Sequence, residues 1–210
     1  MKGSTARVTA LQSAPDSPMT VHIVVAGRRV ATLPRPRCDQ LGLHVDQPWT
    51  AALAKRVAAA AAEDAARADA LRRLARRAHS TRGLEEALLR AGHAAAATRA
   101  ALAALAEHGW LDDAQYAASR AEALNRKAPL AAPALAARLE AEGVSAKQAQ
   151  QAAASAAPPD QDAQLAREAR AARRAGVSMR TMAGRLARRG FDEDAILTAL
   201  AAAGYPVSDA

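Results

Sequence analysis

Two neighbouring carboxylates, Asp112 and Asp113, are the residues of this chain whose type and spacing most resemble a catalytic pair. Paired carboxylates can divide acid–base work between them or bind a metal ion. The same two acids also stand at the start of an amphipathic stretch, where capping and the helix dipole favour acidic side chains. Gln115 completes a capping box with Asp112. We therefore interpret the pair as a helix start rather than as a catalytic site.

Other patterns of catalytic or metal-binding residues are missing from the sequence. The five histidines are dispersed without the spacing of a metal site, and there is no Ser/His/Asp grouping, P-loop or dinucleotide-binding glycine fingerprint. Trp110, Tyr116 and Phe191 could stack on nucleic-acid bases, although aromatic side chains at helix junctions more often pack in a core. We predict a protein that is not an enzyme and that needs no metal or cofactor.

Arginine clusters are the better candidates for a functional surface. The formal net charge is +8 and the pI is near 10.7, so the expected partner is acidic, either nucleic acid or an acidic protein surface. Between Arg167 and Gly190 there are eight arginines and one acid, Glu168. Arginine binds carboxylates and phosphates bidentately, although a solvated face explains any single arginine equally well. The candidate partner-binding residues are Arg72, Arg73, Arg76, Arg77, Arg173, Arg174, Arg185, Arg188 and Arg189.

Composition and three related phrases predict a helical repeat protein. Apolar residues make up 50% of the chain but aromatic residues only 2%, which favours helices packed in thin layers. A leucine followed four residues later by a glycine occurs at Leu88–Gly92, Leu139–Gly143 and Leu186–Gly190, at intervals of about 50 residues. The leucine belongs to the buried face and the glycine ends the helix. Three copies indicate three tandem helical units.

Capping residues and helix breakers predict where the helices begin and end. Thr50 caps a long helix that we expect to continue to about Ala78. At about 100° per residue, its last part has Leu71, Leu74, Ala75 and Ala78 on one arc and Arg72, Arg73, Arg76 and Arg77 on the opposite one. Ser80, Asp112, Ser145, Ser178 and Asp192 are the expected caps of later helices. Trp110 and Leu111, just before the Asp112 cap, are expected to pack in the joint between the first two units.

The N-terminal part has a different character. Residues 1–18 mix Ser, Thr, Pro and Gly without a period, so we expect a disordered leader. Residues 21–25 and 29–33 are β-branched runs on either side of a turn, which predicts a small β-hairpin. Its expected anchors are Leu33, Leu41, Leu43 and Trp49. No apolar run reaches membrane-spanning length, and the lone Cys38 suits a reducing compartment, so we expect a cytoplasmic protein.

Four phrases follow one another along the helical part: Leu71 with Ser80 and Leu84; residues 109–113 with Tyr116; Leu139 with Gly143 and Val144; and Leu186 with Gly190, Phe191 and Ile196. In this order they resemble the RecX family of regulators of the recombinase RecA. The resemblance covers roughly residues 68–203. It marks Trp110, Leu111, Asp112, Asp113, Tyr116, Leu139, Gly143, Leu186, Gly190 and Phe191 as structural motif residues. Gly83 departs from it, because the family usually has an acidic residue there. A mid-helix glycine costs roughly 1 kcal/mol against alanine, so Gly83→Ala should stabilise the chain.

The resemblance implies a mainly helical fold of three tandem three-helix repeats in an elongated curved array, preceded here by the hairpin. The expected segments are 1–18 leader, 19–50 hairpin, 51–111 linker helix and first repeat, 112–158 second repeat, 159–204 third repeat and 205–210 tail. It also implies a monomer that binds RecA–DNA filaments, inhibits strand exchange and ATP hydrolysis, and acts in recombination, DNA repair and the SOS response. Two alternatives stay open: direct DNA binding, single- or double-stranded, through the arginine faces, and a scaffold for another partner.

Overall fold

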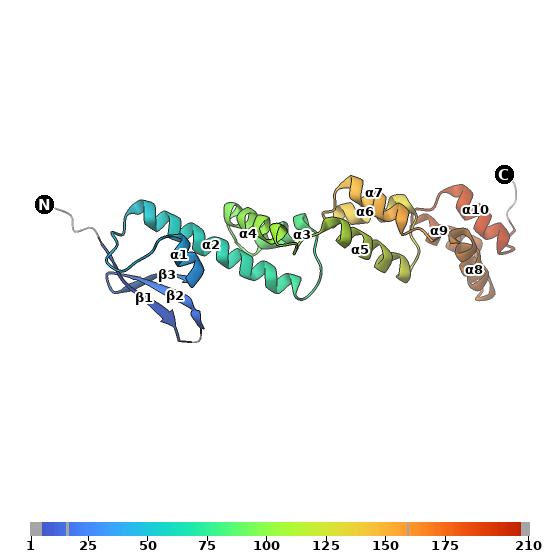
Figure 1. The fold of residues 1–210 in the computed structure, drawn as a ribbon. Helices are drawn as coiled ribbons and strands as arrows, with labels where there is room; N and C mark the ends of the chain where they lie inside the picture. The colour runs from blue at the N-terminus through green and yellow to red at the C-terminus, as the bar shows by residue number, and fades with distance from the viewer. Residues whose placement is uncertain (1–5, 16, 159, 207–210) are drawn as a thin grey trace. The chain divides into compact units, whose positions relative to one another are not determined.

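The structure is a computed structural model that describes residues 6–15, 17–158 and 160–206. The described part is mainly helical and has one small sheet (Figure 1). It divides into two compact units: residues up to 78 together with 84–110, and residues 79–83 together with 111 onward. The elements are β1 (Val8–Ala14), β2 (Ser17–Val25), β3 (Arg28–Pro34), α1 (Arg35–Gln40), α2 (Ala51–Leu74), α3 (Thr81–Arg90), α4 (Ala95–Glu107), α5 (Asp113–Lys127), α6 (Ala132–Ala141), α7 (Ala146–Ser155), α8 (Gln161–Arg174), α9 (Met179–Ala187) and α10 (Glu193–Ala202).

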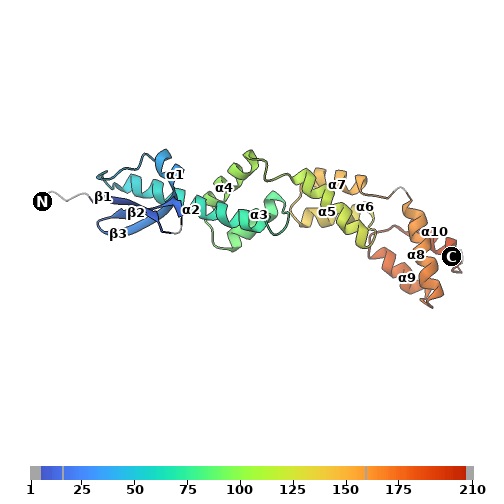
Figure 2. The same cartoon turned by 60° about the horizontal axis from the view of Figure 1, so that its bottom comes forward.

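The sheet is antiparallel, in the order β1-β2-β3, and it packs against α1 and α2 (Figures 1 and 2). Alternate residues of β2, Val21, Ile23 and Val25, are buried, as expected for a strand with one face on a core. The hairpin prediction is confirmed by β2 and β3, and Leu33 and Leu43 lie in this core. The predicted leader is wrong from Val8 onward, because residues Val8–Ala14 form a third strand. Residues 1–5 lie outside the described part.

Helix α2 begins as predicted but ends earlier. The Thr50 side chain accepts a hydrogen bond from the Leu53 amide at 3.1 Å, which caps the first turn. The helix ends at Leu74 rather than near Ala78, and residues 75–79 form a turn and an irregular segment. The predicted apolar arc is therefore wrong, because Leu71 is 36% exposed and Ala75 and Ala78 are also exposed.

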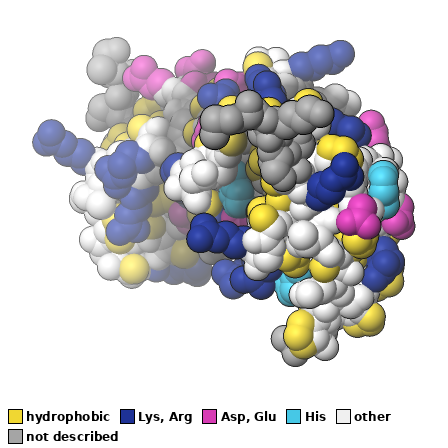
Figure 3. All heavy atoms as spheres, turned by 90° about the vertical axis from the view of Figure 1, so that its left-hand side faces the viewer, with side chains coloured by type: hydrophobic (Ala, Val, Ile, Leu, Met, Phe, Trp, Pro, Cys, Tyr) yellow, Lys and Arg dark blue, Asp and Glu magenta, His cyan; other side chains and the backbone are white. Residues whose placement is uncertain are grey.

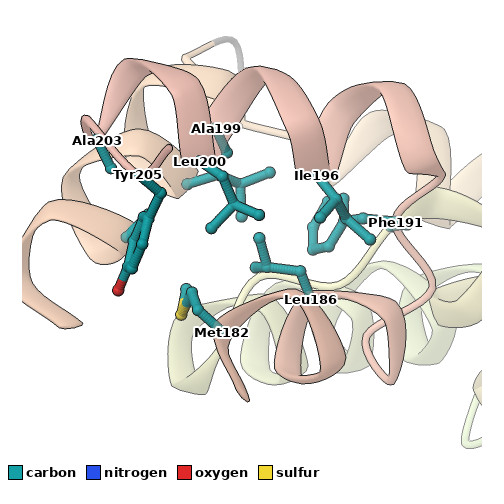
Figure 4. Packing of buried hydrophobic residues seen from close by; sticks show 11 residues of the cluster. Met182, Leu186, Phe191, Ile196, Ala199, Leu200, Ala203 and Tyr205 are labelled. Carbon is teal, nitrogen blue, oxygen red and sulfur yellow. The ribbon is translucent and has the colours of Figure 1, made fainter. Parts of the chain in front are cut away.

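Helices α5–α7 and helices α8–α10, here called the second and third helix triples, each have their own apolar core. Helices α5, α6 and α7 pack around Leu135, Leu139 and Ala149. Helices α8, α9 and α10 pack around a larger cluster, in which Leu186 of α9 points toward Ile196 and Leu200 of α10 (Figure 4). Leu88, Leu139 and Leu186 are fully buried, so the leucine positions predicted from the repeated phrase are confirmed.

The glycine of each repeated phrase ends a helix in the predicted way. Gly92, Gly143 and Gly190 all have φ between 83° and 92°. The residue after each glycine donates its amide to the carbonyl of the leucine four residues before that glycine, as in Val144 N to Leu139 O at 3.1 Å. Ser80, Asp112, Ser145, Ser178 and Asp192 each accept an amide hydrogen bond from three residues ahead, so these caps are confirmed.

The start of α3 is held by the turn between α6 and α7. The Ser80 hydroxyl accepts from the Gly83 amide at 3.0 Å and donates to the carbonyl oxygen of Glu142. A β-carbon on Gly83 would lie 2.9 Å from that hydroxyl and 3.1 Å from the Glu142 oxygen. This geometry opposes the predicted stabilisation by Gly83→Ala, and we now expect the variant to lose stability because overpacking outweighs the gain in helix propensity.

Candidate functional site

Asp113 and Tyr116 connect the start of α5 to two other segments of the same unit. Asp112 caps its own helix, whereas an Asp113 carboxylate oxygen accepts from the Thr81 amide at 2.7 Å and the Thr81 hydroxyl at 3.1 Å. Asp113 thus stabilises the first turn of α3. The Tyr116 hydroxyl donates to the Glu142 carboxylate at 2.7 Å. Asp112 and Asp113 thus stabilise helix starts, and the hydrogen bond to Asp112 confirms its capping interpretation.

Glu142 is an electrostatic centre that the sequence did not reveal. Arg120 binds its carboxylate bidentately, with distances of 2.7 to 3.0 Å. The hydrogen bonds from Arg120 hold the pKa of Glu142 below its usual range, and Tyr116 adds to the effect while burial opposes it. The hydrogen bond with Glu142 in turn raises the pKa of Arg120. The Glu142 carboxylate and backbone carbonyl together connect α3, α5 and the α6–α7 turn.

Glu142→Gln is expected to lower the free energy of unfolding by about 1–2 kcal/mol at pH 7, because charged hydrogen bonds are lost in a partly exposed site. A lowered folded-state pKa stabilises the fold above the unfolded pKa of about 4.3, and this contribution disappears as pH falls through the folded value. The stabilities of parent and variant in denaturant unfolding should therefore converge as the pH falls below the unfolded value and through the lower folded one. Glu140→Gln, at an exposed position of α6, is the control. A difference between parent and variant that does not shrink as the solution is acidified would contradict the role assigned to the carboxylate.

Trp110 does not pack as predicted. Its side chain is 60% exposed, whereas Leu111 is half-buried. The amide of Trp110 closes the α4 turn by donating to the Leu105 carbonyl at 2.9 Å, so its backbone has the structural role and its indole does not. The other two aromatic candidates have structural contacts, since Tyr116 binds Glu142 and Phe191 is buried in the core of the third helix triple.

The first arginine cluster surrounds Asp69. Arg72 and Arg73 each approach its carboxylate at 3.2 Å, and the His93 ring lies at 3.2 Å from the same group. Burial would raise the pKa of Asp69, but the bonds from Arg73 and His93 outweigh it and lower that pKa. Arg72 is still 66% exposed, whereas Arg73 is 33% exposed. Arg76 and Arg77 follow the end of α2 and are exposed, so they do not continue a helical face.

The second cluster includes a hollow of about 340 Å³ between α8 and the end of α10, lined by Arg170, Arg173, Arg174 and Ala203. Arg170 Nε donates to the Ala202 carbonyl and Arg173 Nη1 to the Ala203 carbonyl, both at 3.1 Å. Arginines at a helix C-terminus satisfy its free carbonyls and its dipole. Arg173 also lies 5.9 Å from the centre of the Tyr205 ring. Arg174 is exposed beside them, and Arg170 was not among the predicted residues.

The arginines at the end of α9 and directly after it are of two kinds. Arg185 and Arg188 are exposed. The Arg189 side chain is only 14% exposed, binds Glu168 at 2.7 and 2.9 Å, and donates to the Pro129 carbonyl. Its guanidinium also lies 5.4 Å from the Phe191 ring centre. Arg189 therefore holds the third helix triple to the loop before α6, and we remove it from the candidate surface.

On the face that Figure 3 shows, Lys and Arg side chains are distributed among apolar, acidic and neutral ones. In residues 6–15, 17–158 and 160–206, no three His, Cys, Asp or Glu side chains are grouped so that they could hold a metal ion. Within the same ranges, no helix combines the length and the apolar composition that crossing a bilayer requires. The candidate sites of this chain are thus local arginine clusters.

Comparison with known proteins gives a match at the level of fold. No protein-family model and no curated protein matches the chain. A solved structure of the regulatory protein RecX is similar with a TM-score of 0.74 and 16% identity, over 90% of this chain and 96% of that one. The structure of RecX from Lactobacillus salivarius is similar with a TM-score of 0.60 and 16% identity, over 68% of this chain and 97% of that one. The chain therefore has the RecX fold, as the resemblance of its four phrases predicted.

Proposed function

We propose that this protein is a cytoplasmic, non-catalytic regulator that binds RecA–DNA filaments and inhibits their recombinase and ATPase activities. The observation that carries the proposal is the likeness to the regulatory protein RecX over 90% of the chain. The residues behind the sequence resemblance support it, because Asp113, Tyr116, Gly143 and Gly190 all lie at joints or helix ends of this fold. RecA as the partner follows from the resemblance of these phrases to the family.

The proposed contacts are the exposed arginines of both compact units. One unit contributes the cluster around Asp69 and the end of α2, and the other contributes arginines of α8 and α9. Each cluster would bind a carboxylate of a RecA subunit or a filament phosphate. Two clusters on one chain that engage neighbouring subunits would gain avidity from the second contact. Bound along the filament groove, the protein would hinder entry of duplex DNA and nucleotide turnover. The residues are Arg72, Arg73, Arg76, Arg77, Arg173, Arg174, Arg185 and Arg188.

The test of the function is co-sedimentation with RecA filaments on single-stranded DNA, combined with the RecA ATPase rate. Binding with a reduced ATPase rate is the expected result. Bare single-stranded and duplex DNA at the same ionic strength test the alternative, since phosphate binding alone is strongly salt-dependent and does not need RecA. Equal affinity for bare and RecA-coated DNA would favour a direct DNA-binding protein. Unchanged ATPase at saturating protein would favour a scaffold with another partner.

Removing two arginines from either part of the second cluster is expected to weaken filament binding by about 5- to 30-fold, because exposed ion pairs contribute roughly 0.5–1 kcal/mol each. The variants are Arg173→Ala/Arg174→Ala and Arg185→Ala/Arg188→Ala, measured by co-sedimentation and ATPase inhibition. Loss of the avidity of two-site binding adds to this effect. The control removes the same charge from exposed positions outside the clusters, Arg56→Ala/Arg99→Ala. Folded variants that inhibit RecA as well as the parent would show that the cluster is only a solvated face.

A further inference from the structure

Helices α9 and α10 form an apolar groove on the surface of the third helix triple. The groove has a volume of about 410 Å³. Most of its walls are apolar side chains above the buried cluster of Figure 4. Apolar clefts of this size usually receive an apolar group of a ligand or partner. The lining residues are Met179, Ala183, Gly184, Ala187, Phe191, Glu193, Ile196, Leu197 and Leu200.

Gly184 makes the α9 wall of this groove low in the middle of the helix. A glycine at this position costs helix stability relative to alanine. The interior of the protein does not require it, because a β-carbon on Gly184 would meet only Arg188 Nη1, at 3.6 Å, which is an ordinary contact. Gly83 and Gly143 differ, since their own fold leaves no room for a methyl group. A glycine that the fold does not need, on the wall of an open groove, is what close approach of another chain would require.

The groove is bordered on the α9 side by positive charge. Arg180, Gly184 and Arg188 are spaced by four residues, so they lie along one face of the helix. Both arginines are exposed, and neither has an ion pair with another residue of the described part of the chain. Glu193 lines the groove at the start of α10. The rim is therefore cationic along α9, whereas the start of α10 is acidic and places Glu193 in the lining.

We infer that this groove binds an amphipathic segment of a protein partner, with apolar side chains between α9 and α10 and acidic side chains facing Arg180 and Arg188. Apolar anchors supply the contact area, and the guanidinium groups select acidic neighbours by charge complementarity. The inference rests on the proposed function, in which the partner is a subunit of the RecA filament. It goes beyond that proposal by assigning this contact to an amphipathic segment of the partner protein, where the proposed function left a carboxylate or a phosphate open.

The test uses the full-length protein and RecA filaments on single-stranded DNA, with bare single-stranded DNA in parallel. Ala187→Leu fills the groove at an exposed position and should weaken filament binding about ten-fold or more, while Ala154→Leu on the exposed side of α7 should not. Gly184→Ala should raise the melting temperature and still weaken filament binding, a combination that damage to the fold cannot produce. Arg180→Glu/Arg188→Glu should weaken filament binding most at low salt.

Each result separates the groove from the function on which it rests. A parent protein that does not bind filaments at all overturns the proposed function. A parent that binds, together with Ala187→Leu and Gly184→Ala variants that bind equally well, overturns the groove while leaving the function intact. An equal loss of binding to bare DNA in the charge-reversal variant would assign Arg180 and Arg188 to phosphate instead. Concentration-dependent self-association that Ala187→Leu abolishes would assign the groove to a second copy of the chain.

Discussion

Gly143→Ala is expected to lower the free energy of unfolding by about 2–5 kcal/mol. A left-handed backbone costs an L-residue roughly 1–2 kcal/mol, and overpacking adds about 1–3 kcal/mol. Gly143 has φ +92°, and its new β-carbon would lie 2.8 Å from the Ser80 hydroxyl and 2.9 Å from the Gly83 amide nitrogen. The backbone of the α3 start cannot move away without losing the hydrogen bonds to Glu142 and Asp113.

A glycine in the same unit provides a matched control for this prediction. Gly176 also has a left-handed backbone, with φ +77°, but a β-carbon there would meet nothing within 4 Å. Gly176→Ala should therefore show only the backbone cost, about 1–2 kcal/mol. Denaturant unfolding of both variants gives the difference that belongs to the contact with α3. Equal losses in the two variants would show that the α6–α7 turn does not press against the start of α3.

Arg189→Ala is expected to destabilise the protein by about 2–4 kcal/mol, which is more than we expect from the same substitution at its neighbour Arg188. Truncation of Arg189 leaves the Pro129 carbonyl without its donor and Glu168 without its ion pair, in a site where the arginine is largely buried. It also removes the contact with the Phe191 ring. Arg188 is exposed, so its truncation should change stability by about 0.5 kcal/mol or less.

When filament binding is measured instead of unfolding, the larger effect should come from Arg188→Ala. Arg188→Ala should weaken binding and leave the melting temperature unchanged, whereas Arg189→Ala should lower the melting temperature. Arg189→Lys keeps the charge but cannot bind the carboxylate bidentately, so we expect it to recover only part of the lost stability. An unchanged melting temperature for Arg189→Ala would refute the assigned role and return Arg189 to the candidate surface.

Helix ends were predictable from the sequence because their signals are local. Thr50, Ser80 and Asp112 cap helices through hydrogen bonds that span three residues, and the helix before Gly143 ends with a bond from the Val144 amide to the nearby Leu139 carbonyl. Strand β1 was missed because Val8–Ala14 mixes polar with apolar residues and its pairing with β2 decides its structure. Composition alone therefore described the N-terminal segment incorrectly.

The remaining errors concern residues whose role depends on distant partners. Gly83 was interpreted as a weak point of its helix, but its neighbour in space is Glu142. Arg188 and Arg189 are identical and adjacent in the sequence, yet only Arg189 reaches Glu168 and Pro129. For the candidate site, the positions of the clusters were predictable from the density of arginines. The groove between α9 and α10, and the arginines that border it, required the fold.

The fixed start of α3 has a consequence for how such repeats can be exchanged during evolution or in protein engineering. Residues 79–83 belong by contact to the unit that continues from residue 111, even though α3 continues into the other unit. Their hydrogen bonds go to Asp113 and Glu142, which lie 32 and 62 positions further along the chain. A cassette cut at the beginning of α5 would carry these two acids without the serine and threonine that they bind. The transferable module is therefore discontinuous in sequence, and a working boundary has to be placed before His79.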